Sequence, residues 1–205
     1  MVSYCDSRNL KRKLVRSAEA PIDYGKRAMT GKQFINSLAN GKSDIIQILL
    51  DILAETGSRY CLIGGLAVNA YVEPVVSLDL DIVAAAEDLA AICEAAKKRG
   101  LAAEQFEHSV NLSGPGSDLR IQLQTDPRYQ AFIVSAEERD VLGYRMKVAR
   151  LENVLQGKAW AYMDRTRRKS KRQKDLADIL RIIEAYPQLE ASLPPSVREE
   201  LNRQP

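Results

Sequence analysis

The chain has 205 residues, of which 45% are hydrophobic and 28% charged, and its formal net charge is +3. This composition predicts a soluble globular protein. No stretch approaches the ~20 apolar residues that a membrane span needs, and the N-terminus lacks the apolar segment of a signal peptide. The cysteines, Cys5, Cys61 and Cys93, are widely spaced and do not follow the spacing of a metal site. We therefore expect a cytoplasmic protein with free thiols and no membrane partner.

The charge is distributed unevenly along the chain. Residues 1–42 carry nine Lys and Arg against three Asp and Glu, residues 43–150 carry ten against sixteen, and residues 151–205 carry eleven against eight. The acidic middle is thus flanked by basic ends, which are suited to attract polyanions. We divide the chain accordingly into a basic N-terminal arm (1–42), an α/β core (43–150) and a helical C-terminal segment (151–205).

Hydrophobic periodicity predicts the elements in chain order. Helices are expected over residues 43–54, with Ser43 as the cap, and over 65–71, 87–99, 151–163 and 171–186, with a short last helix after Pro195. Strands are expected over residues 59–63, 77–84 and 118–124, with an edge strand within 101–112 and short strands near 131–134 and 144–148. This order of elements indicates an α/β (α+β) core followed by helices.

The most informative segment runs from Gly64 to Asp81. A strand stops at Gly64-Gly65, a short helix follows, and Asp79 and Asp81 come one residue apart in the next strand. Alternate strand residues share a face, so the two carboxylates lie roughly 6–7 Å apart and repel each other unless a cation lies between them. Mg²⁺ takes one or two carboxylates and completes its shell with phosphate oxygens, and glycine lets a phosphate approach the backbone. The segment predicts a metal-dependent nucleotide site, with a purely structural role as the alternative.

In this order of elements the chain resembles the nucleotidyltransferase superfamily, whose fold is shared with the β-type DNA polymerases. The residues that match the Gly-Gly turn and the Asp-x-Asp pair of that family are Gly64, Gly65, Asp79 and Asp81. Within the family, the chain is most similar to the abortive-infection toxin nucleotidyltransferases (AbiEii/AbiGii-type) and their bacterial relatives. This closer resemblance is carried by Gly-Gly-Leu-Ala at 64–67, Lys-Ala-Trp-Ala at 158–161 and Lys-Asp-Leu-Ala-Asp at 174–178.

The resemblance implies a small mixed-sheet core with flanking helices and a helical C-terminal segment. It also implies transfer of a nucleotide from an NTP to an acceptor hydroxyl on tRNA or protein, with Mg²⁺ or Mn²⁺ held by Asp79 and Asp81, and a cognate antitoxin as a partner. Gly64, Gly65 and the hydroxyl of Ser77 would bind the nucleotide. Lys158 would stabilise phosphate charge, with an ordinary solvated lysine as the alternative.

Two departures from the family pattern weaken the case for activity. The family commonly carries an arginine before its aspartate pair, and this chain has Val75 there. Catalytic members also place a third carboxylate on a later central strand, where this chain has Gln122, whose amide brings no charge and cannot act as a base. Asp118 has the same strand parity and is the alternative ligand, although a turn carboxylate is favoured for it. A catalytically degenerate protein that binds nucleotide or nucleic acid is therefore the second hypothesis.

A basic stretch interrupts the two long C-terminal helices. Its cationic residues are Arg165, Arg167, Arg168, Lys169, Lys171, Arg172 and Lys174. Most charge runs are solvated faces, but this one falls where an extended acceptor could reach the site, so it predicts binding of RNA with a strong salt dependence. The arm could add Arg8, Lys11, Arg12, Lys13 and Arg16 to it. The nearby aspartates, Asp175 and Asp178, are expected to cap the helix or to pair with Arg172 or Arg181.

Overall fold

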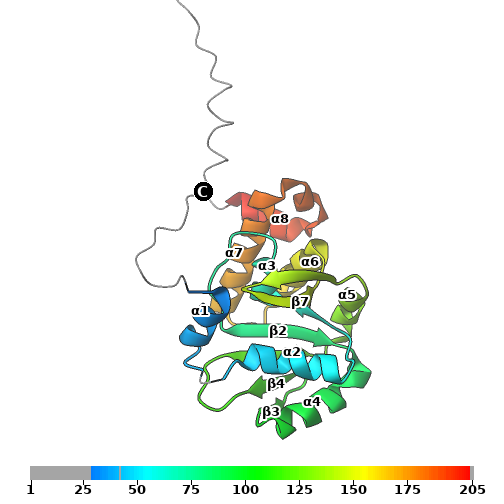
Figure 1. Cartoon of the computed structure of the whole chain (residues 1–205). Helices are drawn as coiled ribbons and strands as arrows, with labels where there is room; N and C mark the ends of the chain where they lie inside the picture. The colour runs from blue at the N-terminus through cyan, green and yellow to red at the C-terminus, as the bar shows by residue number, and fades with distance from the viewer. Residues whose placement is uncertain (1–28, 42, 204–205) are drawn as a thin grey trace, which may run out of the picture. The chain divides into compact units, whose positions relative to one another are not determined.

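The computed structural model describes residues 29–41 and 43–203. A seven-stranded mixed sheet has the order β3-β4-β5-β2-β1-β7-β6 (Figure 1). Its strands are β1 (Tyr60–Ile63), β2 (Asp79–Ala84), β3 (Ala102–Gln105), β4 (Ser109–Ser113), β5 (Arg120–Gln124), β6 (Glu137–Val141) and β7 (Tyr144–Val148). The two parallel pairs are β2 with β5 and β1 with β7, and the other neighbours are antiparallel. The segment Gly64–Asp81 connects the neighbouring central strands β1 and β2 and ends in β2. Gln122, at the predicted position of a third carboxylate, lies in the next strand, β5.

Helices lie on both sides of this sheet. They are α1 (Gly31–Leu38), α2 (Ile45–Glu55), α3 (Gly64–Val68), α4 (Leu89–Lys98), α5 (Gln130–Val134), α6 (Leu151–Met163), α7 (Lys169–Ala185) and α8 (Pro195–Arg203). Figure 1 shows α2 and α4 on one side of the sheet and α3, α6 and α7 on the other. The helices α6 and α7 pack closely against each other, and α3 packs against both. The fold is therefore the mixed α/β architecture that the sequence predicts.

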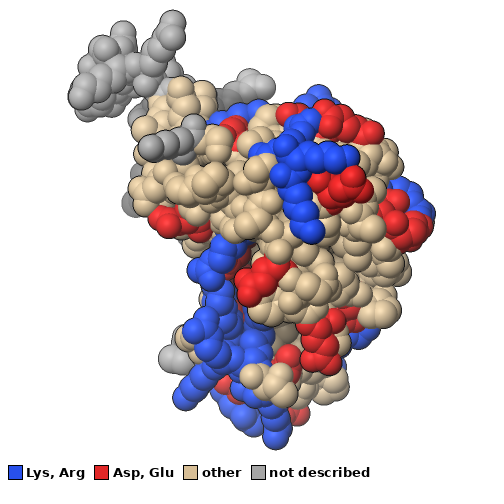
Figure 2. Space-filling view, turned by 90° about the horizontal axis from the view of Figure 1, so that it is seen from below, with Lys and Arg blue, Asp and Glu red and all other residues tan. Residues whose placement is uncertain are grey.

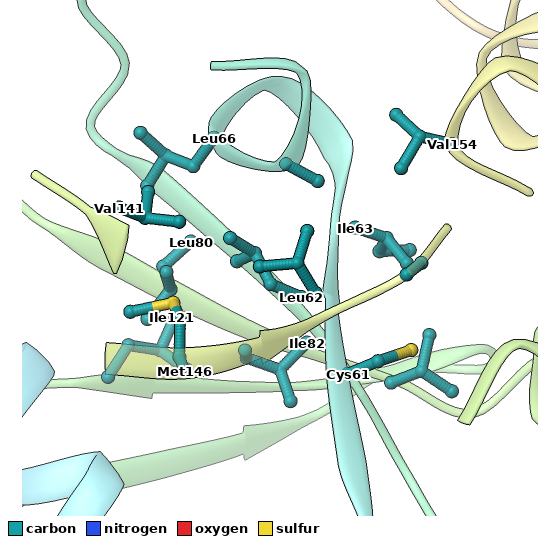
Figure 3. Close-up of a cluster of buried hydrophobic side chains, with 14 of the residues drawn as sticks. Cys61, Leu62, Ile63, Leu66, Leu80, Ile82, Ile121, Val141, Met146 and Val154 are labelled. Carbon is teal, nitrogen blue, oxygen red and sulfur yellow. The ribbon is translucent and has the colours of Figure 1, made fainter. Parts of the chain in front are cut away.

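Alternation along the central strands places apolar side chains on the inside. Leu80 and Ile82 of β2 are buried, as are Leu62 of β1 and Ile121 of β5. Figure 3 shows these side chains gathered with others from β7, α3 and α6 into one cluster. Because side chains alternate across a strand, Asp79 and Asp81 are left on the opposite face of β2 from Leu80 and Ile82. The same packing that buries the core thus fixes the direction of both carboxylates.

The local structure differs from the predictions at three places. Residues 130–134 form a helix and not a strand, because Asp126 accepts a hydrogen bond from the backbone of Arg128 at 2.9 Å and Pro127 starts a helical turn. The strand Glu137–Val141 was missed because its residues are mostly charged, as suits an edge strand paired only with β7. The cap of α2 is Asp44, whose carboxylate accepts from the backbone of Gln47 at 3.0 Å, and not Ser43.

Within the described residues, no helix is both long enough and apolar enough to cross a membrane. The cationic residues of the N-terminal arm, Arg8 to Arg16, lie outside the described residues. Part of the range assigned to that arm is described, however. It contains α1, whose Ile35 is buried in the core.

Candidate active site

Asp79 and Asp81 lie at the start of β2, one residue apart on the same face of the strand. Asp81 is the register partner of Ile63, the last residue of β1, so its carboxylate faces the point where that strand ends and α3 begins. Both residues are partly exposed. The two side chains are therefore anchored in the centre of the sheet and half-buried.

Gly64 allows this arrangement. Its φ of +72° is left-handed, a conformation that side chains rarely adopt, and a Cβ there would lie 2.0 Å from Oδ2 of Asp81. Gly65 differs, because a Cβ at that position would meet nothing closer than the Ser77 hydroxyl at 3.7 Å. The first glycine is thus required by its contact with Asp81, whereas the second leaves a small open space beside Ser77.

The structure places Gln122 directly beside Asp81. The two residues are register partners on the parallel strands β2 and β5, so they share a face. Among the described residues, the amide of Gln122 has no hydrogen-bond partner. Asp118 is not brought to this position: it precedes β5, is exposed, and accepts a hydrogen bond from Asn40 at 2.6 Å. The position beside Asp81 therefore holds a neutral amide.

Asp79 already has a cationic partner. Nζ of Lys171, from α7, donates to Oδ2 of Asp79 at 3.0 Å, and Nε of Arg120 lies 3.7 Å from Oδ1. Burial works in the opposite direction, but the hydrogen bond and charge of Lys171 lower the pKa of Asp79 below its ordinary value. Asp79 is therefore ionised and neutralised from within the chain.

Asp81 is in the opposite situation. Burial of its carboxylate raises the pKa of Asp81, and the positive charge of Lys158 only partly opposes this effect. Among the described residues it has no hydrogen-bond partner. The negative charge of Asp79 raises the same pKa further. Asp81 thus lacks a direct cationic partner, which makes it the side chain that gains most from a bound cation.

Lys158 is buried and doubly paired, and it is not a solvated lysine. Its Nζ lies 3.0 Å from Oδ1 of Asp175 and 2.7 Å from Oδ2 of Asp178, one turn further along α7. Nε of Arg167 donates to Asp175 at 2.9 Å, and Nη1 of Arg181 donates to Asp178 at 2.8 Å. Burial disfavours the ammonium, but the two carboxylates raise the pKa of Lys158 above its usual range. The network joins α6 to α7.

A second set of hydrogen bonds fixes the loop between α3 and β2. The side chain of Asn69 accepts from the backbone of Val75 at 3.0 Å and donates to its carbonyl at 2.7 Å. Nη2 of Arg181 donates to Asn69 at 3.2 Å and to the carbonyl of Glu73. Ser77 is buried at the end of this loop, and its hydroxyl accepts from the backbone of Asp79 at 3.4 Å. These hydrogen bonds therefore fix the position of the loop, and of the start of β2, relative to α3 and α7.

A cavity of about 100 Å³ opens beside Asp81. Its polar lining comprises Asp81, Gln122, Gln124, Asn153, Lys158, Arg167 and Asp175. Tyr129 and Phe132 form an apolar wall, with ring centroids 5.4 Å apart in an edge-to-face arrangement. Gly157 of α6 faces this wall, because a Cβ there would lie 3.1 Å from Tyr129. The cavity brings together residues of β2, β5, α6 and α7 around the carboxylate of Asp81.

The basic stretch runs from the end of α6 into α7 and reaches the site through two of its members, Arg167 and Lys171. Arg172 instead donates to the carbonyl of Tyr162 at 2.6 Å and lies over its ring. The four that remain exposed without an ion pair among the described residues are Arg165, Arg168, Lys169 and Lys174. Figure 2 shows a band of Lys and Arg side chains on one face of the molecule.

The donor set at this site suits one divalent cation. Asp79 and Asp81 supply two carboxylates, which is what a Mg²⁺ shared with substrate phosphates requires. In the part of the chain that the structure describes, no group of three or more His, Cys, Asp or Glu side chains is placed to hold a metal. The unpartnered amide of Gln122 is the remaining oxygen donor beside Asp81.

Some residues around the site were not identified from the sequence. Lys171 was assigned only to the basic stretch, yet it contacts Asp79 across 92 residues of chain. The pairing of Asp175 and Asp178 with Lys158 was also missed, although the pairing of Asp178 with Arg181 was among the alternatives. Their spacing on α7 was a signal, because residues three apart lie on one face of a helix. No local pattern marked Tyr129 or Phe132 as lining the cavity.

A scan of protein-family models finds no match to this chain, and a search of curated proteins finds none either. Solved structures do match. The solution structure of the antibiotic-resistance factor ANT(2'')-Ia is 12% identical, with a TM-score of 0.55 over 77% of this chain and 89% of that one. Its crystal structure in complex with adenylyl-2''-tobramycin gives the same identity and TM-score and covers 95% of that chain.

A third similar structure is that of an antigenic nucleotidyltransferase-like protein from Paracoccidioides brasiliensis. It is 20% identical over 68% of this chain and 74% of that one, but its TM-score of 0.48 is too low to support a conclusion. The two structures of ANT(2'')-Ia superpose on about three quarters of this chain, with a TM-score above 0.5. This chain therefore shares its fold with ANT(2'')-Ia, and that fold is the mixed α/β nucleotidyltransferase fold.

Proposed function

We propose that the chain is a Mg²⁺-dependent nucleotidyltransferase that moves a nucleotide from an NTP to an acceptor hydroxyl. The observation that carries the proposal is the contact between Gly64 and the carboxylate of Asp81. A left-handed glycine is kept against a carboxylate that has no hydrogen-bond partner among the described residues. The glycine adopts this conformation without strain, but burying a carboxylate without a partner costs stability. Groups kept in such surroundings cluster at functional sites.

The residues of the site have separate roles in this proposal. Asp79 and Asp81 would hold Mg²⁺, which when bound neutralises phosphate charge and activates the acceptor hydroxyl. Gly64 and Gly65 would bind the phosphates through their backbone, with open space beside Gly65 and Ser77. Lys158 does not contact phosphate directly in this proposal, because its ammonium group is already paired with Asp175 and Asp178. It acts through its positive charge, which favours the ionised form of Asp81.

The cavity beside Asp81 would receive the acceptor. Its aromatic wall and its amides, Gln122 and Asn153, suit a neutral group with hydrogen-bonding edges. Since the amide of Gln122 cannot take up a proton, β5 supplies no base. We therefore expect slow turnover.

The acceptor in this proposal is tRNA or a protein hydroxyl, and the physiological role is that of a toxin with a cognate antitoxin in the cytoplasm. The motifs shared with the AbiEii/AbiGii-type toxins support this role, and the free thiols Cys61 and Cys93 suit a reducing compartment. An RNA acceptor is supported by the exposed cations of the basic stretch, two members of which reach the site. RNA phosphates would be neutralised along this stretch.

A second candidate is a degenerate protein that binds nucleotide without transferring it. Two contacts favour this candidate. The position beside Asp81 holds the neutral Gln122, and Asp79 is already neutralised by Lys171. In this case Gly64, Asp79 and Asp81 would still bind a metal-nucleotide complex.

Incubation with labelled NTPs, Mg²⁺ or Mn²⁺ and total tRNA distinguishes the two candidates. We expect the full chain to transfer label, and both Asp79→Asn and Asp81→Asn to abolish the transfer. Asp118→Asn is the matched control, because Asp118 is an exposed aspartate outside the site and should be dispensable. Transfer that survives both site variants would exclude the proposed site.

The negative result is also informative if nucleotide binding is measured in parallel. Metal-dependent thermal stabilisation by NTPs without any transfer would replace the first candidate by the second. Neither transfer nor metal-dependent stabilisation by any NTP would exclude both candidates.

A further inference from the structure

The feature that carries a further inference is the contact between Lys171 and Asp79. The ammonium group lies 3.0 Å from Oδ2, a charge-assisted hydrogen bond of ordinary length. It therefore occupies Oδ2, one of the two oxygens with which Asp79 could hold a cation. The inference below rests on the proposed function, because it concerns how many divalent cations the same site takes.

The position of Lys171 is set by the fold. It lies in the first turn of α7, and its backbone donates to the carbonyl of Arg168 at 3.0 Å. One and two turns further along the helix, Asp175 and Asp178 bind the buried Lys158 of α6. Because α6 and α7 are locked together in this way, Lys171 is presented to β2 by a rigid element.

Gln122, the neighbour of Asp81 on β5, also affects how many cations the site can hold. Sites for two divalent cations in this kind of chemistry hold the ions about 3.5–4 Å apart, which requires enough negative charge to offset their repulsion. Here the register partner of Asp81 on β5 is the neutral Gln122. No third carboxylate is available among the described residues to complete such a site.

Charge balance then decides between one cation and two. Asp79, Asp81 and Lys171 together carry one net negative charge, so one divalent ion leaves an excess of one positive charge. Two divalent ions would leave an excess of three positive charges before any substrate arrives, and close like charges repel strongly in a partly buried site. The positive charge of Lys171 instead becomes available to substrate phosphates.

We propose that this site binds a single divalent cation together with an NTP, and that the ammonium of Lys171 takes the place of a second one on Asp79. Lys171 thereby offsets negative charge on substrate phosphates. Gln122, as the neutral neighbour of Asp81, supplies no negative charge for a second cation. The site is thus distinguished from a two-metal site by two side chains on different elements, α7 and β5.

The test is a count of bound Mn²⁺. The full chain is dialysed to equilibrium with Mn²⁺ and, in turn, the α,β-methylene analogues of ATP, GTP, CTP and UTP, and the metal excess on the protein side is measured. Nucleotide-bound Mn²⁺ in solution is the same on both sides and cancels. We expect about one Mn²⁺ per chain with the analogue that binds, and about two per chain would overturn the inference.

A matched pair of double variants tests the two side chains. Gln122→Asp with Lys171→Gln is expected to bind about two Mn²⁺. Gln122→Asp with Lys169→Gln, which removes a neighbouring exposed lysine of the same helix, is expected to remain at about one. Equal counts in the two double variants would overturn the assignment to Lys171. Melting curves identify a variant that fails to fold, and the count for the unchanged chain still decides the main inference.

Failure of this inference can be told apart from failure of the proposed function. If the unchanged chain binds an analogue with two Mn²⁺, the proposed function stands and the single-cation inference falls. If it binds neither Mn²⁺ nor any analogue, both fall.

Discussion

The chain carries two acidic pairs whose surroundings differ completely. On α7, Asp175 and Asp178 are buried and contact three cationic side chains, Lys158, Arg167 and Arg181. Their charge is neutralised inside the chain, and the polar atoms of the pair serve to join α6 to α7. Such a network is complete without a ligand.

On β2, the pair Asp79 and Asp81 is only half neutralised. Asp79 has Lys171, whereas Asp81 has a neutral register partner and a left-handed glycine pressed against its carboxylate. The spacing of two aspartates therefore does not determine their role. The number of cations that the fold supplies determines whether a pair stabilises the fold or is left to bind a cation from solution.

The largest expected effect comes from breaking the internally neutralised pair. Lys158→Met should lower the free energy of unfolding by about 3–5 kcal/mol, because it leaves buried carboxylates without their shared cation. Urea unfolding measures the loss. Lys174→Met is the control: Lys174 is exposed on α7, and its replacement should change stability by no more than ~0.5 kcal/mol. Equal stability of the two variants would mean that the network does not hold α6 and α7 together.

Gly64→Ala tests the close contact between the backbone of Gly64 and the carboxylate of Asp81. The left-handed backbone costs a side chain about 1–2 kcal/mol, and the new Cβ would collide with the carboxylate of Asp81, so we expect a total loss of about 2 kcal/mol or more together with loss of Mn²⁺ binding. Gly65→Ala is matched, because its Cβ would meet only an ordinary contact with Ser77. If both alanine variants unfold at the same urea concentration, the contact with Asp81 is not what requires the first glycine.

The strands and glycines of this region could be read from the sequence because their signals are local. Alternation marked β2 and β5, and the stop at Gly64 marked the end of β1. The family pattern, and not strand parity alone, singled out Gln122 as the position that the structure pairs with Asp81. The mixed α/β fold followed from the same signals. The short run at 131–134 was misassigned because four apolar residues have no period that separates a strand from a helix.

The cations around the two pairs could not be read in this way. Whether Lys171 reaches Asp79 depends on where α7 lies against β2, and the two residues are 92 positions apart. The sequence showed seven cations in one stretch but not that only Arg167 and Lys171 turn toward the site. The packing of α6 on α7 decides this, and packing between distant elements leaves no local pattern.

Asp81→Asn should separate the stability that the unpaired carboxylate of Asp81 costs from its role in binding a metal. Burial raises the pKa of Asp81, so its carboxyl holds a proton in the folded state at a pH where the unfolded chain has released it. The stability it contributes is therefore present below the ordinary Asp pKa and lost as the pH rises through the raised pKa. We expect the asparagine variant to melt higher than the unchanged chain near neutral pH, with the difference vanishing at about pH 3.

The control for that measurement is Asp79→Asn. Burial notwithstanding, Lys171 lowers the pKa of Asp79, so its ionised form contributes stability above the ordinary Asp pKa that is lost as the pH falls. The asparagine variant should therefore melt lower than the unchanged chain near neutral pH. Both variants should lose metal-dependent stabilisation by NTPs. Melting shifts of the same sign in the two variants would contradict the contrast between a paired and an unpaired aspartate.

The smallest expected effect concerns cations that neither pair uses. Arg168 and Lys169 are exposed and contact no carboxylate among the described residues, so the double variant Arg168→Gln/Lys169→Gln should leave urea unfolding unchanged. If they contact RNA phosphates, the slope of log K against log[salt] for binding single-stranded RNA should become shallower by about 1.4, or ~0.7 for each contact. Arg167→Gln should act differently, since its bond to Asp175 ties it to the buried network and its loss should lower stability as well as affinity. A salt slope unchanged in the double variant would remove these two side chains from the RNA contact and leave Arg165 and Lys174 as the exposed cations of the stretch that could still provide it.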